Sequence, residues 1–350
     1  MKTKLLPLLF LIITVYVNGQ NVTIPDANFK NYLVNNSAIN TNGDTEIQIS
    51  EAAAFMGEID LTSAGGVLDL TGIETFINLT GLRASGNDIA SVNITQNIAL
   101  ETLYLDRNQL TTLDLSQNIN LITVDLERNL LTVIDVTSNT SLENLGVRRN
   151  NITTLDISQN TALKFLDTSI TLITSIDFSS NSLLETYWTQ DSVLSSLDLS
   201  QNPNVTYISA YNCNLTGANI ANTNNANMTI VSLDGNPNLS CIQIDSGFTP
   251  PSGYSGWSKD AAASYSDNCT LSVEEFTKPN FTLYPNPTKN TLNIEANNTF
   301  SEVIIYNFLG REIVKTNSKT IDVSNLSQGM YVLKITSVEG TQTAKRFIKQ

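Results

Sequence analysis

Leucines recur through the middle of the chain in a fixed register. From Leu79 the sequence divides into copies of a 21-residue unit, and three successive copies begin at Leu100, Leu121 and Leu142. Each unit contains two half-patterns, LxxLxLxxN and LxxLDLSxN, whose apolar residues alternate as they do on one face of a strand. This self-similarity predicts a mainly β solenoid of about eight stacked coils over residues 59–245, with little helix.

Each half-pattern ends in an asparagine, so the stacked coils should carry two asparagine columns. An inward side-chain amide at such a turn can form hydrogen bonds with backbone groups of neighbouring coils that would otherwise lack partners. We therefore expect each asparagine column to form a ladder of hydrogen bonds with a structural role. Thr171, Ser192 and Cys213 replace asparagine in later coils, and we expect Cys213 to be a core residue. The two columns are Asn87, Asn108, Asn129 and Asn150, and Asn97, Asn118, Asn139, Asn160, Asn181 and Asn202.

The outward positions of the two strands in each coil differ in kind. Those of the second strand repeat Asp and Ser or Thr, which predicts a hydrated ladder or, alternatively, weak binding of divalent cations. Those of the first strand vary from coil to coil, as on a recognition surface, although they could also neutralise acids and cover coil edges. The predicted contact residues are Arg107, Arg128, Arg149, Phe165, Trp188, Tyr207 and Tyr211.

These repeats resemble those of bacterial leucine-rich repeat proteins of the short nested class, related in style to the internalins. The resemblance covers about Ile59 to Asp245, where the motif recurs in register. It implies a protein that binds other proteins or glycans and is not an enzyme.

Residues 20–58 are predicted to form a helical cap over the first coil, because an open solenoid end exposes apolar surface. Within them, NTNGDTEIQISE matches the twelve-residue EF-hand register, with Asn in place of the first Asp and Thr45 in place of Gly. The segment resembles N-terminal caps of secreted flavobacterial leucine-rich repeat proteins. The loop is either a calcium site or a metal-free turn, and its predicted ligands are Asn40, Asn42, Asp44, Glu46 and Glu51.

The N-terminus predicts export. Lys2 and Lys4 precede an apolar run that ends near Gly19, which is typical of a signal peptide over residues 1–19; a retained anchor is the alternative. No membrane-spanning segment is expected in the mature chain. In an exported chain, Cys241 and Cys269 are the natural disulfide pair and would close a second cap over residues 246–270, although Cys213 could instead pair with Cys241.

Residues 281–350 follow a polar linker, 271–280. Apolar and polar residues alternate in short runs, which predicts the strands of a small β-sandwich. They resemble the C-terminal sorting domain of the type IX secretion system, which implies that this machinery is a partner and that the protein reaches the cell surface or the medium. An ordinary adhesive sandwich is the alternative. The residues that carry the resemblance are Tyr284, Pro285, Asn286, Pro287, Gly310, Gly329, Met330, Tyr331, Lys345, Arg346 and Lys349.

Composition narrows the function further. The 350 residues include no histidine, which removes the usual general base and the commonest zinc ligand. Residues 20–280 contain 9 Lys and Arg against 28 Asp and Glu, a net charge of 9 minus 28, or −19, which excludes nucleic acid as a partner.

Together these features predict an exported leucine-rich repeat binding protein for a protein or glycan, with no cofactor except the possible calcium. The alternatives are a structural component of a surface layer and a glycoside hydrolase using Asp125 with Glu127 or Asp167 with Asp191.

Overall fold

The computed structural model describes residues 19–62, 64–251, 256–269, 281–296, 300–307, 312–337 and 342–350. These residues form two compact units, one that ends at Cys269 and one that begins at Phe281. The predicted signal peptide before Gly19, the predicted linker and Gly310 lie outside the described residues.

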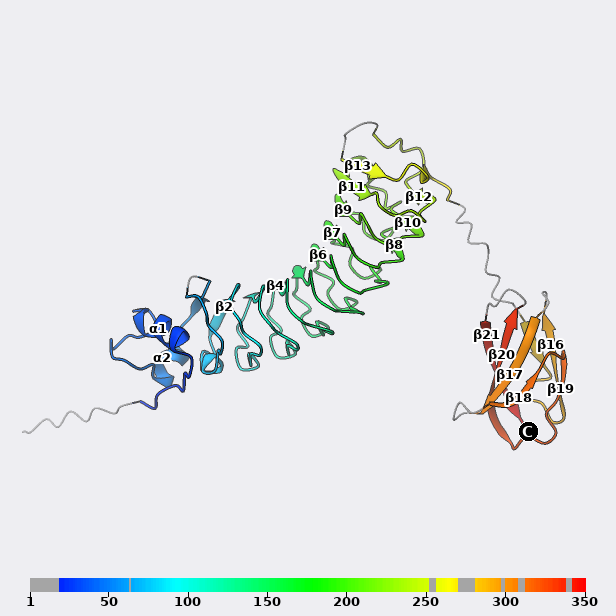
Figure 1. The fold of residues 1–350 in the computed structure, drawn as a ribbon, viewed down its shortest axis with the longest axis horizontal. Coiled ribbons are helices and arrows are strands. Elements are labelled where there is room, and N and C mark those ends of the chain that lie inside the picture. The colour runs from blue at the N-terminus through cyan, green and yellow to red at the C-terminus, as the bar shows by residue number, and fades with distance from the viewer. Residues whose placement is uncertain are drawn as a thin grey trace, which may run out of the picture. The chain divides into compact units, whose positions relative to one another are not determined.

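The first unit is a solenoid whose ten-stranded parallel sheet lies along its inner curve (Figure 1). Leu103 is the Cα partner of Val124, which in turn pairs with Leu145, so residues 21 positions apart are spatial neighbours. This confirms the predicted repeat. In spatial order the strands are β1 (Gly57–Asp60), β2 (Leu79–Arg83), β3 (Thr102–Tyr104), β4 (Thr123–Asp125), β5 (Asn144–Gly146), β6 (Phe165–Asp167), β7 (Thr186–Trp188), β9 (Tyr207–Ser209), β11 (Ile230–Leu233) and β13 (Trp257–Lys259).

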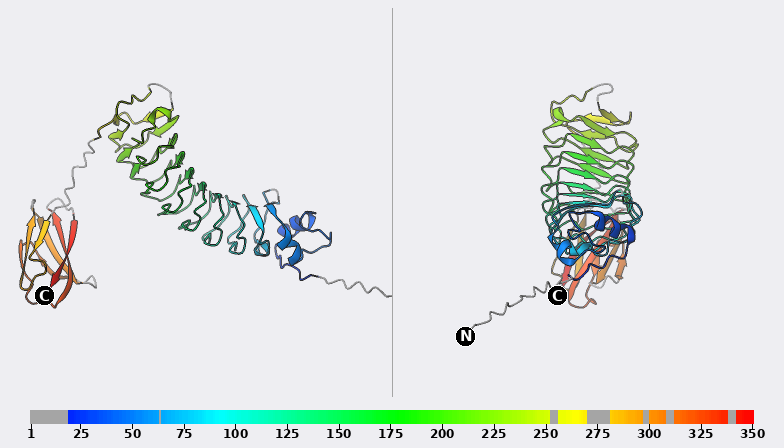
Figure 2. Two further views of the ribbon diagram at one scale, coloured as in Figure 1. Left: turned by 180° about the vertical axis from the view of Figure 1, so that it is seen from behind. Right: turned by 90° about the vertical axis from the view of Figure 1, so that its left-hand side faces the viewer.

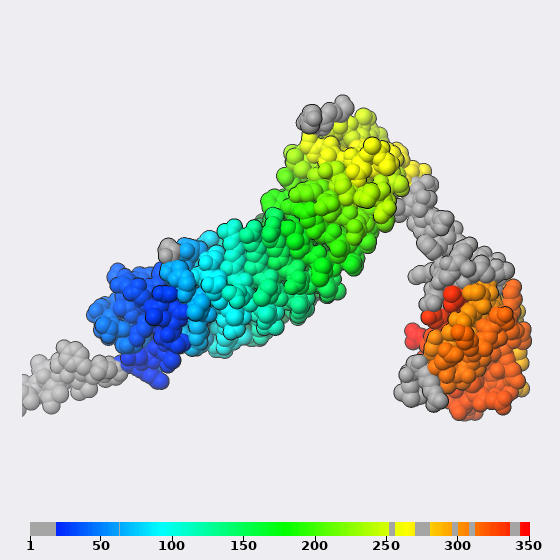
Figure 3. Space-filling model, viewed as in Figure 1, coloured from blue at the N-terminus to red at the C-terminus, as the bar shows by residue number. Residues whose placement is uncertain are grey.

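A second sheet forms on the opposite side of the last coils. Its four parallel strands, in spatial order, are β14 (Ser264–Ser266), β12 (Cys241–Gln243), β10 (Gly217–Asn219) and β8 (Ser196–Asp198). In these last coils the two sheets lie on either side of the apolar interior, and the coils of the solenoid stack without interruption (Figures 2 and 3).

The core contains the inward apolar residues of the repeat, and one of them, Tyr187, also carries a hydroxyl group. Tyr187 occupies the inward position that is Leu103 in an earlier coil, and it is fully buried. Its ring packs edge-on against Phe178 at 4.8 Å between centroids, and its hydroxyl lies 3.1 Å from Thr168 Oγ1. The small, polar Thr168 thus provides both space and a hydrogen bond for the Tyr187 side chain.

Both asparagine ladders form as predicted. In the first, Asn108 Nδ2 donates to Ala84 O and Leu105 O at 2.9 and 3.0 Å, and its Oδ1 accepts from Ile89 N. In the second, the amide nitrogens donate to two backbone carbonyls of preceding coils, as Asn118 does to residues 94 and 97. The ladders hold the coil turns together and are structural. Cys213 is buried in the first ladder and its thiol donates to Thr189 O.

The N-terminal cap contains two helices, α1 (Ala27–Asn35) and α2 (Ile49–Ala54). Asp26 caps α1 through Oδ1 and accepts a 2.8 Å bond from Leu68 N through Oδ2, so one carboxylate joins the cap to the first coil. The short 3₁₀ helices η1 (Ile73–Thr75) and η2 (Asn225–Asn227) lie within the coils. At the other end, the disulfide between Cys241 and Cys269 confirms the predicted pairing.

The second unit is an antiparallel β-sandwich around its own core, as expected. Its three-stranded sheet contains β15 (Phe281–Tyr284), β16 (Thr291–Ala296) and β19 (Thr320–Asp322). The four-stranded sheet contains β17 (Phe300–Asn307), β18 (Glu312–Thr316), β20 (Gly329–Ser337) and β21 (Gln342–Lys349). Across the described parts of both units, no helix has the length and apolar character needed to cross a membrane.

Candidate ligand-binding face

The ten-stranded sheet presents regular rows of outward side chains, because each strand is in register with the next. One row crosses its middle, with each member the Cα partner of the next. We call this the central row. It contains Arg83, Tyr104, Asp125, Gly146, Asp167 and Trp188.

Three of the predicted contact residues meet in an aromatic cluster. The Trp188 ring lies 5.1 Å from Phe165 and 5.9 Å from Tyr207 between centroids, the first pair edge to face. All three rings are partly exposed, and Trp188 Nε1 is buried without a hydrogen-bond partner among the described residues. Tyr211, which is 37% exposed, follows β9 and makes no ring contact within the described part of the chain.

The predicted arginines form a separate column beyond the strand ends. Arg107, Arg128 and Arg149 have left-handed backbone conformations with φ of 55°, 55° and 54°, in the turn just before the first ladder. Their side chains are exposed, and Arg107 and Arg128 pair with their own neighbours Asp106 and Glu127 at 3.8 and 3.2 Å. The structure therefore places the arginines along one edge of the sheet and the aromatic cluster on its face.

Two carboxylates flank Gly146 in the central row. Burial raises the pKa of Asp125 to about 6, and the charges of Asp106, Glu127 and Asp167 add to this effect although Glu127 N donates to the carboxylate. Asp167 is only 6% exposed, and burial raises its pKa despite hydrogen bonds from Ser169. The sequence had placed both acids among the variable outward positions of the first strand and had also offered them as glycosidase candidates.

Two arginines on the sheet were not among the predicted contact residues. Arg83 Cζ lies 3.9 Å from the centre of the Tyr104 ring, while its Nε lies 3.0 Å from Glu58 Oε1. Arg148 Nε lies 3.9 Å from Glu127 Oε1, and its charge lowers the pKa of Asp167 against the effect of burial. Their outward positions on the first strand face were the available sequence signal.

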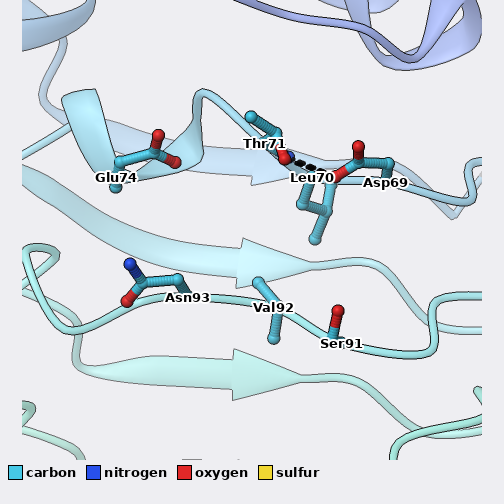
Figure 4. A pocket seen from close by; sticks show the side chains of 7 residues that line it. All are labelled: Asp69, Leu70, Thr71, Glu74, Ser91, Val92 and Asn93. Atoms are coloured by element: carbon cyan, nitrogen blue, oxygen red, sulfur yellow. Dashed lines mark hydrogen bonds between the residues drawn. The ribbon is translucent and has the colours of Figure 1, made fainter.

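The proposed hydrolase pairs are arranged differently from each other. Asp125 and Glu127 project from one coil on the same side, whereas Asp191 lies in the arginine column of the turns and accepts a 2.6 Å bond from Asn212. A depression of about 230 Å³ lies elsewhere, and none of its lining residues belongs to the ten-stranded sheet (Figure 4). It is lined by Asp69, Leu70, Thr71, Glu74, Ser91, Val92 and Asn93.

Several side chains of the EF-hand-like loop form hydrogen bonds within the loop itself. Glu51 Oε1 accepts from the amide of Asn42 at 3.1 Å, and Asp44 Oδ1 accepts from the amide of Glu46 at 2.7 Å. Glu46 pairs with Lys30 at 2.6 Å. Within the described ranges, no group of three or more acidic or cysteine side chains is arranged to hold a metal ion. Calcium binding by Asn40, Asn42, Asp44, Glu46 and Glu51 stays a prediction.

The sorting motif lies at one edge of the sandwich. Asn286 Nδ2 donates to Arg346 O at 3.3 Å and its Oδ1 accepts from Ile348 N at 2.9 Å, so its amide covers part of the edge of β21. Tyr331 is buried and stacks on Phe347, and Lys345 Nζ lies 5.3 Å from the Phe281 ring centre. The exposed members of the predicted set include Tyr284 and Met330.

Comparisons with known proteins agree with both units. Residues 282–350 match the family described as the secretion system C-terminal sorting domain. The tail is therefore a sorting domain, and it directs the protein through type IX secretion to the cell surface or extracellular space. A search of curated proteins found no match.

Among solved structures, the chain is similar to two proteins of Listeria monocytogenes. The match to an internalin (inlF) has 20% identity and a TM-score of 0.50, and it covers 63% of this chain and 64% of the internalin. The match to internalin C2 has 19% identity and a TM-score of 0.51, and it covers 64% of this chain and 97% of internalin C2. The first unit thus has the leucine-rich repeat fold, and a type IX sorting tail follows it in the sequence.

Proposed function

We propose that this exported protein binds an extracellular protein or glycan on the outward face of its ten-stranded sheet, in adhesion or recognition. The observation that carries the proposal is the partly exposed cluster of Phe165, Trp188 and Tyr207 on this varied face. Aromatic side chains offer large contact area at modest entropic cost, and the stacked coils hold them at fixed spacing before the ligand arrives. The remaining proposed contacts are Arg107, Arg128, Arg149 and Tyr211.

The proposal includes no catalytic step and no cofactor. A glycosidase needs two carboxyl groups on either side of a bound sugar, usually in a cleft that excludes water. The depression in Figure 4 is lined by neither Asp125 nor Asp167, and burial raises the pKa of both of these acids. A surface-layer component would instead assemble with itself in the absence of ligand.

Replacing both Trp188 and Tyr207 by alanine tests the proposal. We expect capture of ligands on a combined glycan and protein array to fall by about a hundredfold, because the cluster loses two of its three rings. The circular dichroism spectrum should stay unchanged, since both rings are outward.

Ile98→Ala with Ile119→Ala is the matched control, because both isoleucines are exposed and lie outside the sheet. Equal capture by the aromatic variant and this control would contradict the proposal.

A further inference from the structure

On the basis of the proposed function, we propose that the ligand is a neutral oligosaccharide, which stacks on the rings of Trp188 and Tyr207 and donates hydrogen bonds to the Asp234 carboxylate. The inference deepens the proposed function by selecting a glycan over a protein. It places the glycan on the C-terminal half of the ten-stranded sheet, where the strands from β6 to β13 follow one another along the inner curve (Figure 1).

The aromatic cluster is bordered by a row of serine hydroxyl groups. Trp188 is the Cα partner of Ser209, and the next two members of the same row are Ser232 and Ser258. Ser232 is partly exposed and Ser258 is exposed. Because neighbouring strands are about 4.8 Å apart, the strip from Phe165 on β6 to Ser258 on β13 is about 19 Å long. A strip of this length accommodates several sugar units in a row.

Asp234 supplies a charged acceptor beside this row. Its Oδ1 atom accepts hydrogen bonds from Ser232 Oγ at 3.0 Å and from Ser258 Oγ. Burial raises the pKa of Asp234, but the hydrogen bonds from Ser258 and Ser232 outweigh burial and lower it, so the solvent-accessible carboxylate is ionised at neutral pH. Hydroxyl groups form stronger hydrogen bonds to an ionised acceptor than to a neutral one. The two serines therefore hold Asp234 in position to accept from a sugar hydroxyl.

Tyr211 extends the aromatic surface toward this carboxylate. It lies one coil before Asp234, because Asn212 N donates to Asp234 O at 2.8 Å, and its side chain is 37% exposed. Rings and hydrogen-bonding groups thus alternate across the strip. A sugar has an apolar face of C–H groups and an edge of hydroxyl groups that both donate and accept, so it needs this alternation.

The residue types of this half favour a glycan over a protein. Protein interfaces are enriched in aromatic residues and arginine, and they are depleted of serine and aspartate relative to the rest of the surface. The sequence contains no lysine or arginine from Phe165 to Ser258, whereas the arginine column lies in earlier coils. Here the rings are accompanied by serine and aspartate instead, which are the partners that sugar hydroxyl groups require.

Charge restricts the glycan to a neutral one. An acidic polysaccharide needs cationic side chains at its site, and the strip from Phe165 to Ser258 has none. Residues 20–280 also have a net charge of 9 minus 28, or −19, which repels anionic polymers at long range. A neutral oligosaccharide meets neither obstacle.

Affinity electrophoresis of the full mature chain, in gels that each contain one polysaccharide, tests the inference. The neutral probes are hydroxyethylcellulose, β-1,3-glucan, xylan and galactomannan, and alginate is the anionic comparison. At least one neutral polymer should retard the protein relative to a gel without polysaccharide, and alginate should not. Asp234→Asn should weaken this binding about tenfold, and Ser232→Ala with Ser258→Ala should weaken it by a similar factor.

Asp156 and Ser158 provide matched controls. The amide of Ser158 donates to the Asp156 carboxylate, so this pair is also an aspartate bonded by a serine, but it lies outside the ten-stranded sheet. Asp156→Asn and Ser158→Ala should each change retardation less than about twofold. Circular dichroism of every variant should match that of the unchanged chain, because all of these side chains face outward.

The outcomes separate this inference from the proposed function. Failure of all four neutral polymers to retard the protein, or a preference for alginate, overturns the inference and leaves capture of a protein through Trp188 and Tyr207 intact. Retardation that Asp234→Asn and the serine variant leave unchanged also overturns it, since the glycan would then lie elsewhere. If Trp188→Ala with Tyr207→Ala changes the capture of no polymer and no protein, the proposed function fails as well.

Discussion

At the scale of the residue, Asp125 gives the sheet face a pH dependence whose sign can be derived. Its pKa is raised to about 6 in the folded protein, above the value near 4 of an unfolded chain. The carboxyl group therefore favours folding when it is protonated. Its contribution is fully present below about pH 4 and is lost as the pH rises through 6.

Asp125→Asn removes this cost at neutral pH. We expect the variant to gain about 1 to 2 kcal/mol of unfolding free energy relative to the unchanged chain at pH 7.5, and almost nothing at pH 4. The figure is below the full value of the shift because the side chain is partly exposed. Urea unfolding at the two pH values measures the difference.

Asp156→Asn should change stability in the opposite direction to Asp125→Asn. Hydrogen bonds from the amide and hydroxyl of Ser158 lower the pKa of Asp156, so its contribution is present above the unfolded pKa and is lost in acid. This variant should lose rather than gain stability at pH 7.5. Equal behaviour of the two variants would contradict the assignment of Asp125 as a buried, unmatched carboxylate.

Residue types alone identified part of this face. The variation among outward positions was sufficient to select Phe165, Trp188 and Tyr207, which the structure brings together. Gly146 was not predicted to matter. The effect of its missing side chain becomes visible only when Asp125 and Asp167, each 21 residues away, are known to flank it. The arginines lie away from the aromatic cluster because they stand in a turn with left-handed backbone conformation. Residue type does not predict this conformation, since Gly86, Arg107 and Ile170 all adopt it.

At the scale of the structural element, the two asparagine ladders should differ in strength. Asn108 satisfies two carbonyls and also the amide of Ile89, whereas the Oδ1 atom of Asn118 has no donor among the described atoms. We expect Asn108→Ala to cost about 3 kcal/mol of unfolding free energy and Asn118→Ala about 1 to 2 kcal/mol, because the first leaves an additional buried group unsatisfied.

Thermal or urea unfolding of the two single variants measures this order. Both positions are buried, so loss of side-chain volume affects them alike and the difference reports on hydrogen bonding. A larger loss for Asn118→Ala would show that the amide of Ile89 has another partner or that the ladder carbonyls dominate.

The disulfide of the C-terminal cap should account for much of the stability of that end. Cys241 and Cys269 are 28 residues apart, and closing a loop of this length stabilises a folded chain by about 3 kcal/mol in the chain-entropy model. Cys241→Ser with Cys269→Ser should lower the unfolding midpoint, and reductant should have no further effect on this variant. Trp257 packs between Phe248 and Tyr265 in the same cap, so its fluorescence reports the transition.

Cys213→Ser is the matched control for this loss. Cys213 is buried in the first ladder, where Ser192 already occupies the equivalent position one coil earlier. Serine should therefore replace it with a change of less than about 1 kcal/mol. A loss as large as that of the double variant would assign the stabilisation to the ladder rather than to the disulfide.

The arrangement of elements followed from the sequence wherever it depended on the repeat. The period placed Leu103 beside Val124, and the spacing of the asparagines located both ladders. The confinement of the second sheet to the last coils did not follow, because the half-pattern LxxLDLSxN is present in coils with and without those strands. The burial of Tyr187 could not be predicted from the repeat either, because it depends on contacts with Phe178 and Thr168, which come from other positions of the coils.

At the scale of the whole molecule, the chain separates the proposed binding face from the sorting tail. Among the described residues, the solenoid and the sandwich each have an apolar core of their own. The tail also has an opposite charge balance, with 8 Lys and Arg against 5 Asp and Glu in residues 281–350. Two independent cores imply that damage to one unit leaves the other folded.

Removal of residues 281–350 should therefore abolish surface delivery and leave ligand capture unchanged. In a bacterium with a type IX system, the shortened protein should accumulate inside the outer membrane, because the sorting domain that the machinery recognises is gone. The Trp188→Ala, Tyr207→Ala variant should show the reverse, reaching the surface or medium in normal amount without capturing ligand. Fractionation with immunodetection measures delivery, and array binding of the purified proteins measures capture. If tail removal also destroyed capture, the sandwich would form part of the binding site and the division between the two units would be wrong.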